Sequence, residues 1–396
     1  MHYYVDHTSR FQHNTGIQRC VRSIAAALIA EGIPLRPLLW DRGHQDFVPA
    51  DRGQRDHLAR WNGPPPERWA TDDPPAGEHW SDRWLLVVEL VCGPQVPSAS
   101  ALRQAASRRG WRVAWVFHDA IPLRLSHLYG RRGPEVSRRH GVYMEGLALF
   151  ERVFANSHTT ADHLSRFLRA RGHAEDRVQT LVTALPLATE FPGQSRGAPP
   201  PSRCQALWMA PGQLRRPLRL LCVGSLEPRK NHAALFKAVA DLVHRRRWQS
   251  ELVLVGWAND RRVVAQLQRA RELGLPIRWE AQADDQRLQS LYRWCDATVY
   301  PSMEEGFGLP VAESLWQWRP CVCSGDGALG ELAAEGGCLT FDSANWRALA
   351  AALEALQQQP ELYGRLEREL HQRRMRPWQQ YAREMVEDLA GREQAR

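Results

Sequence analysis

The chain of 396 residues is long enough for two or three domains, and its 43% hydrophobic and 24% charged residues are typical of a soluble globular protein. No apolar run approaches the roughly 18 residues of a membrane-spanning helix. The first residues, MHYYVDHTSRF, lack the apolar stretch of a secretory signal. Eight cysteines form no C-x-x-C pair and no cluster with zinc spacing. These features predict a cytoplasmic protein with reduced thiols.

The formal net charge of +8 comes almost wholly from arginine, because Lys230 and Lys237 are the only lysines. Arginine-rich segments such as 131–140 and 244–248 could form basic patches, which attract anionic partners. The simpler interpretation is a solvated surface, and we adopt it for most of these residues. A peripheral contact with the inner face of the cytoplasmic membrane stays open for 131–140.

Strands and helices alternate along the first half of the chain. HYYVD (2–6) predicts a strand, and residues 16–32 predict a helix because their apolar residues recur at helical spacing. Residues 42–82, rich in Pro, Gly, Asp and Trp, predict a long loop or partly ordered insertion. Further strands are predicted at PLRPLLW, WLLVVELV, WRVAWVFHD, RVFANS and VQTLV, and further helices at 97–109, 134–150 and 158–171.

Residues 191–217 are dense in Pro and Gly and interrupt this rhythm, which predicts a boundary. The alternation then resumes with LRLLCVGSL, ELVLVGW, IRWEA, ATVYPS, PCVCSG and CLTFD. Apolar strands alternating with helices predict parallel sheets covered on both faces. We therefore expect two Rossmann-like α/β domains facing each other across a cleft. The expected bounds are 1–195, a linker at 196–217, a second domain at 218–375, and a helix at 376–396 that crosses back to the first domain or packs on its own.

The stretch VYPSMEEGFGLPVAES (299–314) places two glycines and a proline between Glu305 and Glu313. A helix interior disfavours both residue types, so the stretch predicts a strand, a tight turn and then a helix. The backbone N–H groups of Phe307, Gly308 and Leu309 would point out of the helix N-terminus toward a polar or anionic ligand. The alternative is a plain turn with an acidic rim.

A second polar turn, VGSLEPRKN (223–231), follows another predicted strand. Gly224 and Ser225 close the strand, and Arg229 and Lys230 follow. A guanidinium beside an ammonium suits a diphosphate. The phosphate-binding pattern G-x-x-x-x-G-K-[ST] is absent. A surface charge pair is the alternative, although the scarcity of lysine counts against it.

VGSLEPRKNH followed by EEGFGLPVAES resembles the retaining glycosyltransferases of family 4, which have the GT-B fold. Their E-x7-E motif is matched by Glu305 and Glu313. TGIQR (15–19) resembles the first loop of the bacterial surface-polysaccharide branch, and the segments at 116–123 and 152–164 are similar to two more segments of the family. The resemblance runs from about residue 3 to 342, and PWQQYA is similar to the family's crossing helix.

The resemblance implies roles in the second half of the chain. Arg229 and Lys230 would neutralise the nucleotide diphosphate in place of a metal. Glu313 would bind the ribose hydroxyls and Glu305 the donor sugar. The backbone of residues 306–309 would cradle sugar and phosphate. Glu304 doubles the acidic position, so the sugar contact could belong to either glutamate.

In the first half, the resemblance implies that Gly16 lets the chain approach the diphosphate closely. His118 would lie near the transferring sugar, although a strand-end histidine is often structural. Asp119 would orient His118 or an acceptor hydroxyl. Ser225 departs from the family, because many members carry arginine there. The expected donor-binding residues are Gly16, Gly224, Ser225, Arg229, Lys230, Gly306, Phe307, Gly308, Leu309 and Glu313, and the expected catalytic residues are His118, Arg229, Lys230 and Glu305.

The resemblance implies hexose transfer with retained anomeric configuration onto a hydroxyl of a bacterial polysaccharide or lipid-linked glycan. The best donor candidate is GDP-mannose or a related GDP-sugar, and UDP-glucose stays open. We expect no cofactor, no metal and no nucleic-acid partner. The acceptor proton could pass to the β-phosphate oxygen, and a covalent route through Glu305 is the rival.

Two other functions stay open at this point. The first is a GT-B epimerase or phosphorylase. A phosphorylase often needs a lysine that carries pyridoxal, and both lysines of this chain belong to the phosphate loop and its helix, which argues against a phosphorylase. The second is an arginine-rich protein that binds nucleic acid or anionic membranes. Dispersed arginines without a recognised nucleic-acid module argue against that function.

Overall fold

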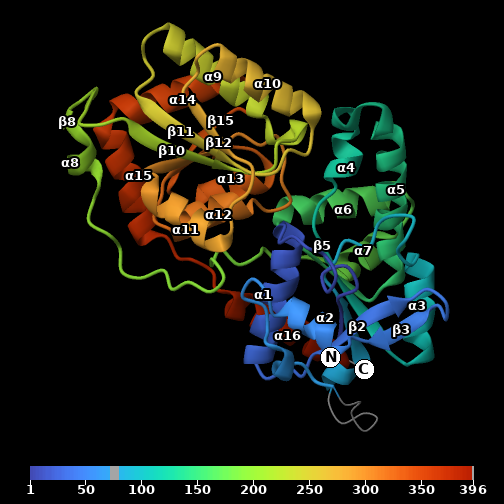
Figure 1. Cartoon of the computed structure of the whole chain (residues 1–396). Helices are drawn as coiled ribbons and strands as arrows, with labels where there is room; N and C mark the ends of the chain where they lie inside the picture. The colour runs from blue at the N-terminus through green and yellow to red at the C-terminus, as the bar shows by residue number, and fades with distance from the viewer. Residues whose placement is uncertain (72–79, 395–396) are drawn as a thin grey trace. The chain divides into compact units, whose positions relative to one another are not determined.

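The computed structural model describes residues 1–71 and 80–394, and the chain forms two compact α/β units (Figure 1). The first unit comprises Met1–Ala188 and Arg376–Arg396, and the second comprises Thr189–Met375. The C-terminal segment thus belongs to the same unit as the N-terminus.

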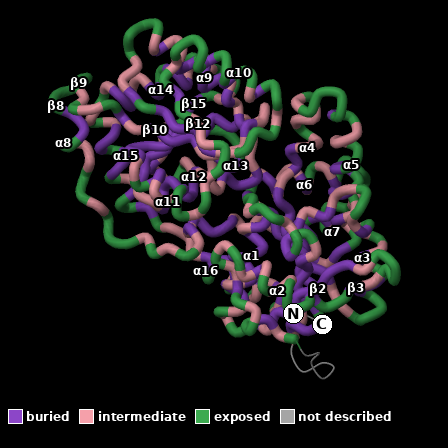
Figure 2. Tube along the Cα trace, in the orientation of Figure 1, coloured by how far each residue is buried: buried purple, intermediate pink, exposed green. Residues whose placement is uncertain are grey.

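The first unit is built on a seven-stranded sheet of order β3-β2-β1-β4-β5-β6-β7. Neighbouring strands are parallel except for β2 and β3. The strands are β1 (His2–Tyr4), β2 (Arg36–Asp41), β3 (Asp46–Pro49), β4 (Trp84–Val87), β5 (Arg112–Phe117), β6 (Arg152–Ala155) and β7 (Val182–Ala184). Most of these strands are buried, as the purple stretches of Figure 2 show. Such burial fits apolar strands covered by helices.

The helices of the first unit include a C-terminal helix that packs on the first helix of the chain. The α-helices are α1 (Gly16–Ala30), α2 (Arg52–Leu58), α3 (Ala99–Arg108), α4 (Ile121–Arg124), α5 (Gly133–Gly146), α6 (His158–Ala170), α7 (Glu175–Leu181) and α16 (Trp378–Gln394). The 3-10 turns are η1 (Pro66–Arg68), η2 (Trp80–Arg83), η3 (Ser126–Arg132) and η4 (Leu147–Leu149). In Figure 1, α1 and α16 lie side by side. Arg152 Nε donates to Asp388 Oδ1 of α16 at 2.8 Å, which ties α16 to the sheet.

Two expectations for the first unit are wrong. VQTLV (178–182) was expected to be a strand, but all of it except Val182 lies in α7. Acidic Glu175 and Asp176 in the first turn favour a helix, and Val178 and Leu181 are buried three residues apart on one face. For 42–82 the sequence predicts a long loop or a partly ordered insertion, and the long loop is wrong, because the stretch contains β3, α2, η1 and η2; residues 72–79 lie outside the described residues.

The second unit contains a fully parallel six-stranded sheet of order β12-β11-β10-β13-β14-β15. Its strands are β10 (Leu218–Val223), β11 (Ser250–Val255), β12 (Ile277–Glu280), β13 (Ala297–Tyr300), β14 (Cys321–Ser324) and β15 (Cys338–Phe341). Its helices are α9 (His232–His244), α10 (Arg261–Glu272), α11 (Asp285–Trp294), α12 (Leu309–Trp316), α13 (Gly327–Ala334), α14 (Trp346–Gln358) and α15 (Pro360–Gln372), with the 3-10 turn η5 (Pro228–Lys230). The six predicted strands all form.

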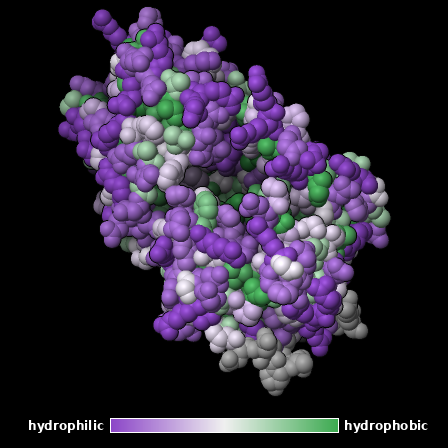
Figure 3. Space-filling model, turned by 45° about the vertical axis from the view of Figure 1, so that its right-hand side comes forward, coloured by the Kyte–Doolittle hydropathy of each residue, from purple (hydrophilic) through white to green (hydrophobic). Residues whose placement is uncertain are grey.

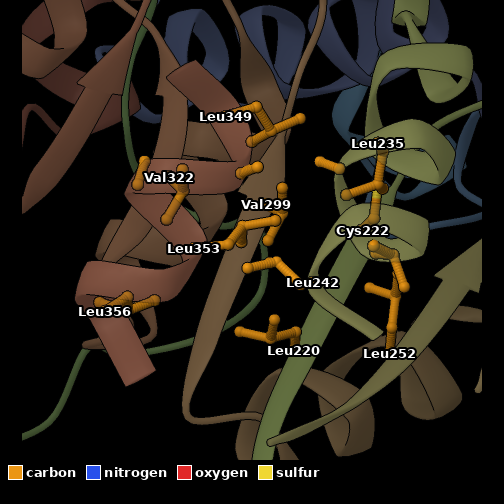
Figure 4. Packing of buried hydrophobic residues seen from close by; sticks show 14 of the residues in the cluster. Leu220, Cys222, Leu235, Leu242, Leu252, Val299, Val322, Leu349, Leu353 and Leu356 are labelled. Atoms are coloured by element: carbon orange, nitrogen blue, oxygen red, sulfur yellow. The ribbon is translucent and has the colours of Figure 1, made fainter. Parts of the chain in front are cut away.

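Alternate residues of these strands build two apolar layers, one on each face of the sheet. Leu220 and Cys222 face one layer, and Leu221 faces the other, where Tyr292 and Leu291 of α11 pack. Figure 4 shows the first layer, in which Leu220, Cys222, Leu252, Val299 and Val322 of the sheet face Leu235 and Leu242 of α9 and Leu349, Leu353 and Leu356 of α14. The sheet is therefore a rigid platform for the loops at its carboxyl edge.

Residues 196–217, for which the sequence predicts a linker, fall within the second unit. They contain α8 (Cys204–Leu207) and the antiparallel pair β8 (Trp208–Ala210) and β9 (Gln213–Leu214). In the view of Figure 3, hydrophilic residues cover most of the surface and hydrophobic residues form small groups. Across residues 1–71 and 80–394, every helix is too short or too polar to span a membrane.

Candidate functional site

The loops that follow the two central strands of the second unit carry the predicted phosphate and sugar ligands. The loop after β10 includes η5, which presents Arg229 and Lys230, and α9 begins two residues later. Asn231 between them has a φ of 55° in the left-handed region, which lets the chain turn from η5 into α9 within one residue. Because β13 is the neighbour of β10, the loop containing Glu305 leaves the same edge of the sheet.

Glu305 is the centre of a dense hydrogen-bond cluster. Its Oε1 atom accepts from Arg229 Nη1 at 2.9 Å, Lys230 Nζ at 2.7 Å and the Tyr300 hydroxyl at 3.0 Å. The Ser302 hydroxyl donates to the same oxygen at 2.5 Å, and Lys230 Nζ also donates to the Tyr300 hydroxyl at 2.5 Å. The residues predicted to bind phosphate and sugar therefore bind one another.

A second carboxylate holds the other side of the Arg229 guanidinium. Arg229 Nη2 lies 2.8 Å from Glu227 Oε1, and the Ser225 hydroxyl donates to that same oxygen at 2.8 Å. Ser225 thus acts on Arg229 through Glu227. The cluster contains two cations and two carboxylates, so its formal charges balance.

Burial and charge shift the pKa values of the cluster in opposite directions. Burial raises the pKa of Glu305, but Arg229 and Lys230 and the hydrogen bonds from Lys230 and Ser302 outweigh it and bring this pKa to about 2. Burial, aided by Arg229, lowers the pKa of Lys230 against the opposing effect of Glu305. Burial and the nearby Glu305 charge raise the pKa of Tyr300 well above its ordinary value. Glu305 is therefore an ionised acceptor at neutral pH.

The turn from Glu305 to α12 depends on Gly308. Gly308 caps the helix with a φ of 102°, and a Cβ at this position would lie 2.5 Å from Leu329 Cδ2 and 3.2 Å from Leu332 Cδ1. Gly306 and Phe307 precede it, and the helix begins at Leu309. Since the first N–H groups of a helix lack intrahelical partners, this backbone can serve as the predicted cradle.

Glu313 lies one turn into α12 and is buried. Its Oε2 atom accepts a hydrogen bond from the Tyr292 hydroxyl of α11 at 2.8 Å. Tyr292 thus sets the orientation of the carboxylate predicted to bind ribose. Glu313 follows the same turn as Glu305 but does not appear among the hydrogen bonds that converge on Glu305 Oε1.

In the first unit, both ring nitrogens of His118 are engaged by the fold. Its Nε2 atom lies 2.5 Å from the Val88 carbonyl oxygen, and its Nδ1 atom lies 3.0 Å from Asn156 Nδ2. These partners fit a neutral ring that donates from Nε2 and accepts at Nδ1. Burial lowers the pKa of His118, which favours the same neutral form. A contact between His118 and a sugar would require one of these hydrogen bonds to break.

Asp119 and Gly16 occupy turns in the same unit. Asp119 Oδ1 accepts from the backbone N–H of Ile121 at 2.9 Å, and the Asp119 carbonyl accepts from His140 Nε2 at 2.9 Å. Asp119 thus organises the start of α4. Gly16 is the first residue of α1, as its position in TGIQR indicates.

Sequence reasoning did not find Glu227, Tyr300 or Glu89 as members of these sites. Tyr300 looks like an ordinary strand residue, and Glu227 like a loop acid. Glu89 had a detectable signal, because it is the single charged residue in WLLVVELV. It is 1% exposed, and we return to it below.

Residues 210–373 match the family model "Glycosyl transferases group 1". This range lies in the second unit and contains the Arg229, Lys230 and Glu305 cluster. The second unit carries a glycosyl transferases group 1 domain. Within the part of the chain that the structure describes, no group of three or more His, Cys, Asp or Glu side chains could hold a metal ion.

Curated proteins similar to this chain include two mannosyltransferases of Escherichia coli. The O-antigen chain mannosyltransferase B is 32% identical over 198 residues, which are 49% of this chain and 49% of that protein. The serotype-specific mannosyltransferase WbdA is 25% identical over 331 residues, which are 80% of this chain and 37% of WbdA. The chain thus spans less than half the length of either relative.

Solved structures with similar folds include two that match nearly the whole chain. Sucrose-phosphate synthase from Thermosynechococcus elongatus aligns with a TM-score of 0.68 and 18% identity, covering 100% of this chain and 99% of that one. HepE of Anabaena, solved with UDP and glucose, aligns with a TM-score of 0.60 and 15% identity over 98% of this chain and 99% of that one. At these identities the likeness shows the fold alone, which is the GT-B fold expected from the sequence.

Proposed function

We propose that this protein is a retaining hexosyltransferase that moves a sugar from a nucleotide-diphosphate donor onto a hydroxyl of a polysaccharide or lipid-linked glycan. The observation that carries this proposal is the cluster of Arg229, Lys230 and Glu305 within the group 1 domain. The mannosyltransferase relatives favour a GDP-mannose donor. A UDP-sugar is the second candidate, because HepE was solved with UDP and glucose.

The cluster can exchange its internal carboxylates for a diphosphate. Arg229 holds Glu227 and Glu305, and Lys230 holds Glu305, so both cations are oriented before the donor arrives. A diphosphate that binds them would gain charge-assisted hydrogen bonds from a preorganised pair. As the glycosidic bond breaks, negative charge grows on the departing phosphate, and these cations stabilise it.

Glu305 suits the role of a hydrogen-bond acceptor for the donor sugar better than that of a nucleophile. Four donors converge on its Oε1 atom, and its pKa of about 2 makes it a weak base. We therefore favour proton transfer from the acceptor hydroxyl to a β-phosphate oxygen over a covalent intermediate on Glu305. Glu313, oriented by Tyr292, would hold the ribose. The contacts predicted for Gly16, His118 and Asp119 stay predictions.

The proposal keeps a peripheral membrane contact through 131–140, but with less net positive charge than the sequence suggests. Arg138 and Arg139 both bind the Glu135 carboxylate, which reduces the charge that they offer to a lipid surface. Arg131 and Arg132 end η3 beside α5.

The test is a transfer assay with an octyl mannoside acceptor in EDTA, using GDP-mannose, UDP-glucose and dTDP-rhamnose as separate donors. We expect nucleotide diphosphate release from GDP-mannose and a product whose anomeric proton matches the configuration of the donor. Absence of release from every donor would reject the transferase assignment for these substrates, and an inverted product would reject retention.

A further inference from the structure

A buried carboxylate in the first unit has no part in the mechanism described above. Glu89 lies two residues beyond the end of β4, at the carboxyl edge of the sheet, and is 1% exposed. Its Oε2 atom accepts from the backbone N–H of His7 at 2.8 Å, and its Oε1 atom accepts from the backbone N–H of Thr8 at 2.5 Å. Each carboxylate oxygen thus holds one of two successive amides in the loop that follows β1.

The same loop is tied to the start of α1. His7 Nδ1 lies 3.0 Å from Gln18 Nε2, and Gln18 Oε1 accepts from the Thr15 hydroxyl. Thr15 is the N-cap of α1 and directly precedes Gly16. Residues 7–15, which we call the first loop, are therefore held at their start by Glu89 and Gln18 and at their end by Gln18.

The neighbour of Glu89 holds a second predicted site residue. The Val88 carbonyl accepts the hydrogen bond from His118 Nε2. Two consecutive residues after β4 thus orient both the first loop and His118. Glu89 supplies the part of this arrangement that depends on charge, since a backbone carbonyl does not titrate.

We propose that ionised Glu89 is a positioning residue that orders the first loop for glycosyl transfer. The proposal rests on the transferase function proposed above. The carboxylate offers two acceptor oxygens to two N–H groups, whereas a protonated carboxyl turns one oxygen into a donor. Protonation would then weaken the hydrogen bond at the oxygen that carries the proton, and would loosen the loop.

The surroundings of Glu89 place its titration near neutral pH. Burial raises its pKa to about 7 against the hydrogen bonds from Thr8 and His7, and the Asp6 charge adds to the rise. Burial lowers the pKa values of the nearby His7 and His118 and raises those of Tyr3 and Tyr4, so these four groups are neutral at pH 7. The groups that face Glu89 are Tyr3 and Tyr4 of β1 and Asp6 and His7 of the following turn.

Ionised Glu89 lowers stability against global unfolding, which returns the carboxylate to water, whereas local opening of the first loop breaks the two hydrogen bonds that the carboxylate accepts. A carboxyl whose pKa is raised on folding favours the folded state when protonated, and this contribution is lost as the pH rises from about 4.5 through 7. Burial makes the ionised state of Glu89 unfavourable, yet Glu89 accepts hydrogen bonds from two loop amides in that state. Such a perturbed buried acid is typical of a functional position.

The direct test measures amide hydrogen exchange of a peptide covering the first loop in the wild type and in Glu89→Gln at equal pH. The ratio of the two rates cancels the intrinsic dependence on pH. We expect exchange on the order of tenfold faster in the variant at pH 8 and nearly equal rates at pH 6, where wild-type Glu89 is protonated. Equal rates at pH 8 would overturn the proposal.

The second readout is the pH profile of transfer. Wild-type kcat/KM should fall as the pH drops below about 7, and Glu89→Gln should be slower at pH 8 with a flat profile over this range. Glu367→Gln is the matched control, because Glu367 is a buried acid that also accepts a backbone N–H, from Arg203 at 2.9 Å. It should keep the wild-type profile. A wild-type profile without the acidic limb would overturn the role of Glu89 in transfer.

Two outcomes separate this proposal from the proposed function. If the wild type transfers no sugar but shows the predicted exchange pattern, the transferase function fails and the loop assignment stands. If Glu89→Gln does not fold, the wild-type protection factors between pH 6 and 8 decide, because they should rise with pH as Glu89 ionises. A constant protection factor would contradict the loop assignment.

Discussion

At the scale of single residues, the charge of Glu305 is the feature on which the candidate site depends. Buried Lys230 and half-buried Arg229 meet one oxygen of this carboxylate, together with two hydroxyl donors. A buried cation without a partner costs several kcal/mol, so Glu305 keeps the phosphate ligands both charged and oriented before the donor arrives. His118 differs from Glu305, because the fold engages both of its ring nitrogens.

Glu305→Gln tests this electrostatic role. The pKa of Glu305 is lowered on folding from 4.5 to about 2, so its contribution of about 3 kcal/mol is present above pH 4.5 and is lost as the pH falls toward 2. Urea unfolding should show the variant to be less stable by about 3 kcal/mol at pH 7, with the difference shrinking to about half at pH 3. A difference that does not change between pH 7 and 3 would show that lost packing, and not lost charge, destabilises the variant.

At the scale of elements, two turns after neighbouring strands assemble the cluster. The turn after β13 depends on Gly308, whose positive φ and close contact with Leu329 exclude a side chain. The turn after β10 depends on Asn231 in the left-handed region. Both turns connect a rigid strand to a helix, which fixes the backbone on either side of each functional residue.

Gly308→Ala should lower the free energy of unfolding by about 2–4 kcal/mol, because the positive φ and the contact with Leu329 both oppose a Cβ. Gly274→Ala is the matched control, since Gly274 has a φ of +78° but no atom within 4 Å of the added Cβ. It should cost only about 1 kcal/mol. Denaturant unfolding measures both, and equal losses would show that the contact with Leu329 relaxes without cost.

The sequence predicts these turns because Gly, Pro and adjacent charges have strong local preferences. Arg229, Lys230 and Glu305 are found from their sequence pattern. The ion pairs of Arg229 and Lys230 with Glu305 require β10 and β13 to be neighbours, and only the strand order of the folded sheet shows that they are. VQTLV was predicted wrongly because a short apolar run fits a helix face as well as a strand. Glu89 was not found because its partners are backbone N–H groups far away in the sequence.

At the scale of the whole molecule, the matched family model covers only the second unit, where the predicted donor ligands gather. The first unit contains the first loop, His118 and α16, and it lies outside the matched range. The two Escherichia coli relatives are mannosyltransferases, and the chain covers less than half of the length of either one. The acceptor is therefore to be found by assays on this chain.

The most direct test of the central claim is nucleotide diphosphate binding by Lys230→Ala, with Lys237→Ala as the matched control. Lys237 is exposed on α9 and is the only other lysine. Thermal unfolding is followed with GDP, UDP, ADP, dTDP and CDP, with and without EDTA. A ligand at 100 times its dissociation constant should stabilise the wild type by about 2.7 kcal/mol. We predict that one diphosphate stabilises the wild type and Lys237→Ala equally in EDTA and fails to stabilise Lys230→Ala; equal stabilisation of both variants, or of none, would contradict the account.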